Sequence, residues 1–323
     1  MQVNTLNFRP LPGLASRHVQ TIVSCFFPAG KPPPFKEWHV DLGSGDYLCC
    51  TVSTPPKWKR TERTVVLIHG MGGSHDSGYM IRMSRKLYLK GIKVVRVNLR
   101  GAGPGKGLSK LLYHAGTSED MLKVLHGLKV DAPASEIVVI GFSLGGNIAL
   151  KLAGELGGKA KELVKAFIAV CAPMDLAQTV RSIQEKRNRL YHSYYLKTIL
   201  DQAGAKAPQN IQTIVEFDDL VTAPHWGYQD SDEYYRECSS IRFLPRIQQS
   251  THLLFSRDDP FICMDAVHGM SLPHAVQVWT AEQGGHMGFL GWTSKPRSFF
   301  WMDDVLLKWI DEDFSHHRLE KVF

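Results

Sequence analysis

The sequence predicts an α/β fold with a mostly parallel, doubly wound sheet and an inserted helical cap. Short runs of β-branched and apolar residues, typical of strands buried on both faces, alternate with helical patterns along most of the chain. This alternation stops between about residues 174 and 248 and then resumes. The composition, with 44% hydrophobic and 21% charged residues, excludes a fibrous repeat and a disordered chain.

The elements are expected in the following order. Residues 1–35 are rich in proline and should wrap over the surface without regular structure. A Gly-Ser-Gly turn at residues 43–45 then separates two short runs, which predicts a β-hairpin. The hairpin strands are Trp38–Leu42 and Tyr47–Ser53; the buried strands are Thr64–Ile68, Ile92–Val97, Ile137–Ile140, Phe167–Cys171, Leu253–Phe255 and Ala275–Trp279; the helices span 78–90, 117–129, 143–157 and 297–313.

Residues 174–248 form the predicted cap. The segment is rich in tyrosine, arginine and glutamine, has helical patterns and contains no run of the buried-strand type. Because it lies between two strands of the sheet, we interpret it as an insertion within a single domain of residues 1–323. Caps of this kind carry amphipathic helices and aromatic side chains over a site.

The charge distribution and the lack of targeting signals restrict the binding partners and the cellular compartment that we expect for this protein. The net charge is +7, but the densest basic stretch, residues 57–63, lies in a proline-rich loop and not on a clustered basic face, so we expect a solvated charge excess and no nucleic-acid partner. Contact with lipid surfaces remains open, and no oligomeric state is indicated. Met1–Pro10 lacks a signal-peptide pattern, no apolar run is long enough to span a membrane, and the cysteines form no CxxC pair. We therefore expect a cytoplasmic protein.

A G-x-S-x-G pentapeptide, Gly141–Gly145, carries the sharpest chemical signal. It follows the buried run Ile137–Ile140 and opens a helical pattern, which is the strand–turn–helix context of a nucleophile elbow. The alternative is a glycine-rich turn with an incidental serine. The context favours Ser143 as a nucleophile.

A serine nucleophile needs a base and a carboxylate that orients the base. After Ser143, an acid is expected beyond a late strand and a histidine beyond the last strand. Asp258 and Asp259 follow the run Leu253–Phe255, and His286 follows the last run within Gly-Gly-His-Met-Gly. We assign His286 as the base and prefer Asp259 as the acid, with Asp258 as its alternative.

Two backbone N–H groups should form an oxyanion hole. Leu144, which follows the serine, supplies one, and Met71 in the loop His69–Gly73 supplies the other; His69 is interpreted as structural. His75-Asp76 lacks further ligands for a metal, and the glycine-rich stretch 100–105 lacks the complete dinucleotide-binding pattern. We therefore predict no metal and no cofactor.

With these motifs in place, the chain resembles the α/β-hydrolases, and longer stretches narrow the resemblance to the YheT-like branch, related to the ABHD1- and ABHD3-type hydrolases and the yeast ethanol acyltransferases. The resemblance implies ester hydrolysis, with Ser143, Asp259 and His286 as nucleophile, acid and base. The residue after Arg100-Gly101 departs from the family pattern. The matching stretches are Arg17–Ile22, Arg100-Gly101, Tyr113–Gly116, Glu119-Asp120, Phe217–Asp219, Thr222–Pro224, Tyr234-Tyr235, Asp258–Phe261 and Gly284–Phe289.

The predicted function is a serine carboxylic-ester hydrolase, or lipase-like esterase of lipid metabolism, that forms an acyl-enzyme with an apolar small-molecule ester. An acyltransferase that replaces water by an alcohol is the alternative on the same residues. A non-catalytic binding protein of the same fold is the second class, and it would normally have lost one of the three residues. None is missing here.

Overall fold

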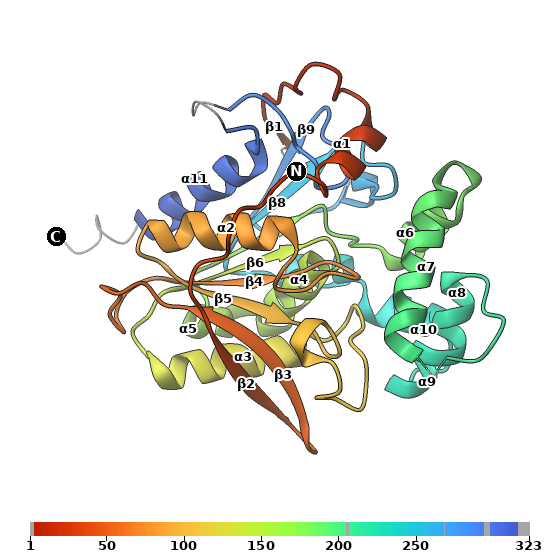
Figure 1. Ribbon diagram of the computed structural model, residues 1–323, viewed down its shortest axis with the longest axis horizontal. Helices are drawn as coiled ribbons and strands as arrows, with labels where there is room; N and C mark the ends of the chain where they lie inside the picture. The colour runs from red at the N-terminus through yellow and green to blue at the C-terminus, as the bar shows by residue number, and fades with distance from the viewer. Residues whose placement is uncertain (1–2, 205–206, 268, 294–297, 316–323) are drawn as a thin grey trace.

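The computed structural model describes residues 3–204, 207–267, 269–293 and 298–315. Its centre is a nine-stranded sheet in the order β1-β9-β8-β7-β6-β4-β5-β3-β2 (Figure 1). In this order, every pair of neighbouring strands from β1 across to β5 is parallel, whereas the pairs β5–β3 and β3–β2 are antiparallel. The α/β class and the mostly parallel sheet are confirmed.

The predicted hairpin and all six predicted buried strands are present, with ends displaced by a few residues. Their apolar runs are buried because helices cover both faces of the sheet. The strands are β2 (Lys36–Gly43), β3 (Asp46–Ser53), β4 (Thr64–Ile68), β5 (Lys93–Asn98), β6 (Ile137–Phe142), β7 (Ala166–Val170), β8 (Ser250–Ser256) and β9 (Val276–Ala281).

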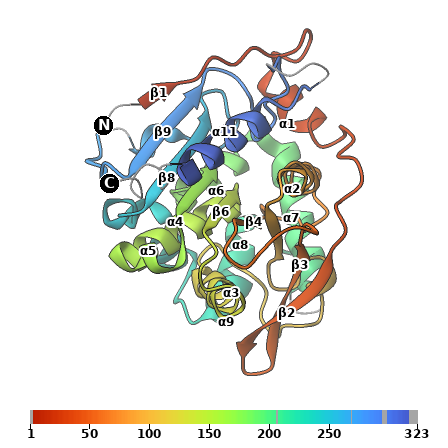
Figure 2. The ribbon, with the colours of Figure 1, turned by 90° about the vertical axis from the view of Figure 1, so that its left-hand side faces the viewer.

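Helices cover the sheet in two layers. One core packs α2 (Gly78–Leu89) and α11 (Trp301–Ser315) against one face, and the other packs α3 (Ser118–Asp131) and α4 (Leu144–Leu156) against the opposite face. Figures 1 and 2 show both layers, with the short α5 (Ala160–Leu163) beside α3 and α4. Residue 297, where the last helix was expected to begin, lies outside the described residues.

The expectation that residues 1–35 lack regular structure is wrong. Val3–Thr5 forms β1, which pairs in parallel with β9, and Arg17–Val23 forms helix α1. Both elements are short. In α1 the most buried residues are Gln20 and Thr21, which are polar. The sequence therefore lacks the periodic apolar residues by which a helix is usually predicted.

Between β7 and β8 the described chain is helical and contains no strand. The helices are α6 (Leu176–Gln184), α7 (Arg189–Ala203), α8 (Ile214–Phe217), α9 (Ala223–Trp226) and α10 (Ser231–Cys238), with a π-helical turn at Asp218–Thr222. Figure 1 shows α6 to α10 gathered at one end of the sheet. None of the helices that the structure describes is long and apolar enough to cross a membrane.

Candidate active site

Ser143 occupies a sharp turn between β6 and α4. Its backbone has φ 51° and ψ −119°, a conformation that costs a non-glycine residue about 1–3 kcal/mol. The flanking glycines are required by space: a Cβ on Gly141 would lie 2.1 Å from the Gly145 oxygen, and a Cβ on Gly145 would lie 2.4 Å from the Ile68 oxygen. The turn therefore presents Ser143 beyond the end of its strand, as the pentapeptide predicts.

A chain of hydrogen bonds joins the three predicted side chains. The Oγ of Ser143 lies 2.9 Å from Nε2 of His286, and Nδ1 of His286 lies 2.8 Å from Oδ2 of Asp259. His286 and Asp259 are almost fully buried as side chains. The arrangement can move a proton from the serine to the imidazole while the carboxylate holds the imidazole tautomer.

The loop after β8 separates the roles of the two neighbouring aspartates. Oδ1 of Asp259 accepts from the backbone N–H groups of Phe261 (3.1 Å) and Ile262 (2.9 Å), which leaves Oδ2 for His286. Asp258 instead accepts from the Ser256 hydroxyl and, at 2.8 Å, from the Gly285 N–H. Asp258 therefore ties the acid loop to the loop that carries His286.

Helix α1 holds the histidine loop, a function that the sequence analysis did not assign. The His286 N–H donates to Thr21 Oγ1 at 2.8 Å. Gln20, fully buried, accepts from the Leu290 N–H at 2.7 Å and donates to the Leu290 oxygen at 2.9 Å. The contact is tight, because a Cβ on Gly288 would lie 2.5 Å from the Gln20 oxygen. The stretch Arg17–Ile22 was one of those that carried the family resemblance, but no function was assigned to its residues.

The loop after β4 lies directly against Ser143. A Cβ on Gly70 would lie 3.1 Å from Cβ of Ser143. The register explains this proximity, because Ile68 at the end of β4 is paired with Gly141 on β6. The loop and the serine therefore leave the sheet side by side.

Three of the four amides at positions 70–73 have an acceptor. Gly70 donates to Tyr79 Oη and Gly72 to Tyr113 Oη, both at 2.9 Å, and Gly73 donates to the Gly70 oxygen at 3.0 Å. Within the described residues, the Met71 N–H has none. The two tyrosine hydroxyls were not predicted from the sequence, although Tyr113 lies in a stretch that carried the resemblance.

The first residue of α4, Leu144, has no intrahelical acceptor for its N–H, as for any first helical residue. Met71 and Leu144 both line the pocket that contains Ser143. Their amides are therefore available to a developing negative charge.

His69 has a structural environment, in line with its interpretation. Its Nδ1 lies 2.7 Å from the Gly70 oxygen, and its Nε2 accepts from the Leu99 N–H at 3.1 Å. Only the neutral imidazole fits both partners, since one nitrogen donates and the other accepts. Complete burial lowers the pKa of His69 to about 4, so the ring stays neutral and holds the loop.

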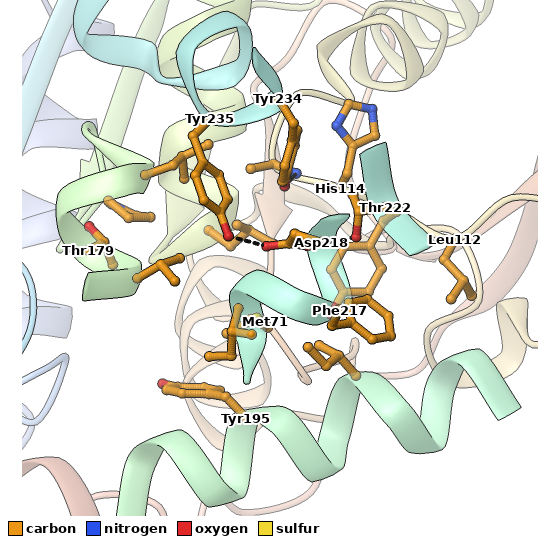
Figure 3. Close-up of a pocket in the computed structure, with 18 of the residues that line it drawn as sticks. Met71, Leu112, His114, Thr179, Tyr195, Phe217, Asp218, Thr222, Tyr234 and Tyr235 are labelled. Carbon is orange, nitrogen blue, oxygen red and sulfur yellow. Dashed lines mark hydrogen bonds between the residues drawn. The ribbon is translucent and has the colours of Figure 1, made fainter. Parts of the chain in front are cut away.

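One pocket extends from Ser143 to the helices between β7 and β8. Met71 and Tyr195 face it together with Phe217, Tyr234 and Tyr235 (Figure 3). Much of the remaining wall is aliphatic and comes from α6, α7, α8 and the π-helical turn that follows α8. These residues include Leu176, Val180, Ile183, Ile199, Ile214 and Val221.

Asp218 places a carboxylate in this apolar wall. It accepts from Thr222 Oγ1 at 2.7 Å and from Tyr235 Oη at 2.6 Å, and Figure 3 shows the second bond. Burial raises the pKa of Asp218 from 3.8 to about 6, opposed by the two hydrogen bonds. The native protein therefore binds this proton more tightly than the unfolded chain does.

Asp218→Asn should raise stability at pH 8. Between pH 4 and pH 6 the wild-type free energy of unfolding falls as pH rises, because the unfolded carboxyl ionises first. At pH 8 the native carboxyl is ionised, so the full free-energy cost of burying its charge is present. The uncharged amide removes about 1–3 kcal/mol of that cost. Urea unfolding at pH 4 and pH 8 measures the effect, with Asp201→Asn, at an exposed carboxylate on α7, as control. A variant that is destabilised equally at both pH values contradicts the prediction.

Groups of residues with metal-ligand atoms occur twice in the described chain, each with three atoms within 4.8 Å of one another. In one of them, Asp259 and His286 are already bonded to each other. His75 does lie beside Asp76, with Nε2 3.3 Å from Asp76 Oδ1, and its Nδ1 lies 3.0 Å from Asn98 Oδ1. The groups are Glu37, His39 and Cys49, and Cys171, Asp259 and His286.

Comparisons with known proteins agree with this geometry. Residues 63–225, just over half of the chain, match the family described as alpha/beta hydrolase fold. The chain is 28% identical to YheT of Escherichia coli (strain K12) over 322 residues, which covers 95% of this chain and 94% of that protein. It is 27% identical to Phospholipase ABHD3 of Homo sapiens over 332 residues, covering 93% and 78%.

A solved structure, the esterase Pf2001 of Pyrococcus furiosus, has the same fold. It superposes with a TM-score of 0.58 at 16% identity and covers 96% of this chain and 99% of that one. The family match includes the loop after β4 and the serine turn of β6 and α4. The chain belongs to the α/β-hydrolase fold family and is an esterase- or lipase-type hydrolase.

Proposed function

We propose that this protein is a serine carboxylic-ester hydrolase that forms an acyl-enzyme with esters of apolar acyl chains. The observation that carries the proposal is the continuous hydrogen-bond chain from Ser143 through His286 to Asp259. In this proposal Ser143 is the nucleophile, His286 the base and Asp259 the acid.

The reaction begins with attack of Ser143 Oγ on the ester carbonyl carbon. Nε2 of His286 takes the hydroxyl proton as the new C–O bond forms, and Asp259 stabilises the imidazolium through Nδ1. The tetrahedral intermediate then collapses, and His286 returns the proton to the departing alcohol. Water, activated by the same imidazole, attacks the acyl-enzyme and releases the acid and free Ser143.

The oxyanion is assigned to the N–H groups of Met71 and Leu144. Preorganised donors of this kind stabilise charge that develops only in the transition state. The proposal is supported by the occupied amides on both sides of Met71 and by the position of Leu144 at the start of α4, where the helix dipole favours negative charge.

Residues 174–248 are proposed to act as a cap of one domain, and the pocket wall that they supply is proposed to hold the acyl chain. Aliphatic and aromatic side chains from this segment share one pocket with Ser143, and such surfaces bind apolar chains through burial. The relative named Phospholipase ABHD3 supports an ester with an acyl chain of this kind.

A panel of p-nitrophenyl esters tests the proposal. We expect kcat/KM to rise from acetate to a medium-length chain, by roughly fourfold per added CH₂ while the chain is still being buried, and then to fall. The corresponding p-nitroanilides should be turned over far more slowly. Absence of ester turnover contradicts the proposed function. Turnover that is best with acetate contradicts only the proposal that the wall from residues 174–248 holds the acyl chain.

Val180→Ser in the cap wall is the matched variant for this panel. It introduces a hydroxyl at the wall without touching Ser143, His286 or Asp259. We expect the medium-chain advantage to shrink several-fold while turnover of the acetate ester changes little. An equal loss for all chain lengths would place the acyl chain elsewhere.

A further inference from the structure

The net positive charge of the protein is concentrated in two segments. Residues 1–35 contain three basic residues and no acidic one, and residues 181–197 contain five basic residues and one acidic one. The rest of the chain contains 30 basic and 30 acidic residues. The whole excess of +7 therefore lies in two segments that are about 150 residues apart in sequence.

Most of these basic side chains are free to act on a partner. Seven of the eight are exposed, and Arg17 is half-buried. Within the described chain, only Arg187 forms an ion pair, with Glu185 at 2.6 Å. The eight are Arg9, Arg17, Lys31, Arg181, Lys186, Arg187, Arg189 and Lys197.

Large apolar side chains are exposed on the same two segments. Phe26, just after α1, is 79% exposed, and Leu190 and Tyr194 on α7 are 70% and 60% exposed. Ile22 on α1 is also exposed. Exposed apolar groups that lie among unpaired basic ones mark an interaction surface more strongly than either feature alone.

The fold brings the two segments together beside the candidate active site. Nδ1 of His18 on α1 lies 3.0 Å from Oη of Tyr191 on α7, and the two rings stack at 5.8 Å. The ring centroid of Tyr191 also lies 5.3 Å from that of Phe261, and the Phe261 centroid lies 4.4 Å from that of His286. The surface is thus carried by helices that also contact the residues around His286.

We propose that α1 and α7, with the segments that flank them, form a docking face for the surface of an anionic phospholipid bilayer. The eight basic residues pair with lipid phosphates, and Ile22, Phe26, Leu190 and Tyr194 enter the headgroup region. Each basic residue near an anionic membrane strengthens binding several-fold, and inserted apolar side chains strengthen it further through their burial. The face would hold the protein where ester lipids are present.

Vesicle sedimentation with the full chain tests this proposal. The wild type should bind vesicles of phosphatidylcholine with about 30% phosphatidylglycerol, should not bind phosphatidylcholine alone, and should dissociate as salt rises. R181Q/K186Q/R189Q/K197Q should lower the affinity at least about tenfold. F26S/L190S should lower it several-fold and leave the salt dependence unchanged.

Matched variants distinguish binding through this face from a general effect of net charge or of exposed apolar side chains. K57Q/K59Q/K106Q/K161Q removes the same charge from exposed lysines elsewhere, and L89S/V130S removes exposed apolar side chains elsewhere. Both should bind as the wild type does. Equal loss in the control and face variants overturns the proposal, as does wild-type protein that ignores anionic vesicles.

Folding, catalysis and general polyanion binding are each controlled separately. Every face variant should keep the wild-type circular dichroism, so that lost binding is not lost folding. Ser143→Ala should bind vesicles normally, because docking does not depend on catalysis; esterase failure and docking failure are therefore distinguishable. Binding to a short DNA duplex that matches vesicle binding, and that is lost in the same charge variant, would identify a general polyanion site and overturn the lipid assignment.

Discussion

Ser143→Ala is expected to abolish ester hydrolysis, with kcat lower by about 10⁵- to 10⁶-fold. The alanine has no atom to form the acyl bond, and the bond of 2.9 Å to His286 is lost. The variant should also escape labelling by a fluorophosphonate probe, which modifies activated serines. Intact-protein mass spectrometry and stopped-flow hydrolysis of a medium-chain p-nitrophenyl ester measure both effects.

Ser143→Gly is the companion to this variant, because it separates chemistry from backbone strain. Alanine keeps the Cβ and with it the cost of φ 51°, so its thermal stability should stay near that of the wild type. Glycine adopts this conformation freely, so it should raise the free energy of unfolding by about 1 kcal/mol while remaining inactive. Labelling that persists in either variant would move the nucleophile to another residue.

The sheet could be predicted because each central strand has an uninterrupted apolar run. Val65 and Val138, for example, are both fully buried in the sheet, and such burial leaves no polar alternation in the sequence. β1 could not be predicted in this way, since three residues at an edge carry no period. α1 could not be predicted either, since its buried face consists of Gln20 and Thr21.

The candidate site was predictable where backbone geometry restricts residue type. Gly141 and Gly145 have no space for a Cβ, so their spacing around Ser143 is visible in the sequence. The supports of the site were not visible, because they are single hydrogen bonds between distant segments. Thr21 and His286 are 265 residues apart, and the hydroxyl of Tyr113 reaches the Gly72 amide across 41 residues.

Asp259→Asn is expected to lower kcat/KM by about 10⁴-fold, through the tautomer of His286. Oδ1 of Asp259 accepts two backbone N–H groups, from Phe261 and Ile262. In the variant, the amide oxygen must keep these donors, so the NH₂ group faces Nδ1 of His286. Nδ1 then accepts, the ring proton moves to Nε2, and His286 no longer takes the proton of Ser143.

Asp258→Asn is the control for this prediction, and it should cost less than about tenfold. Its oxygen accepts from the Ser256 hydroxyl and the Gly285 N–H, and an amide oxygen accepts from the same two donors without reversing any bond. Steady-state kinetics on one medium-chain ester compares the two variants, and the imidazole N–H resonances of His286 report the tautomer. A larger loss for Asp258→Asn than for Asp259→Asn would exchange the roles of the two aspartates, because only the residue that faces Nδ1 controls which ring nitrogen carries the proton.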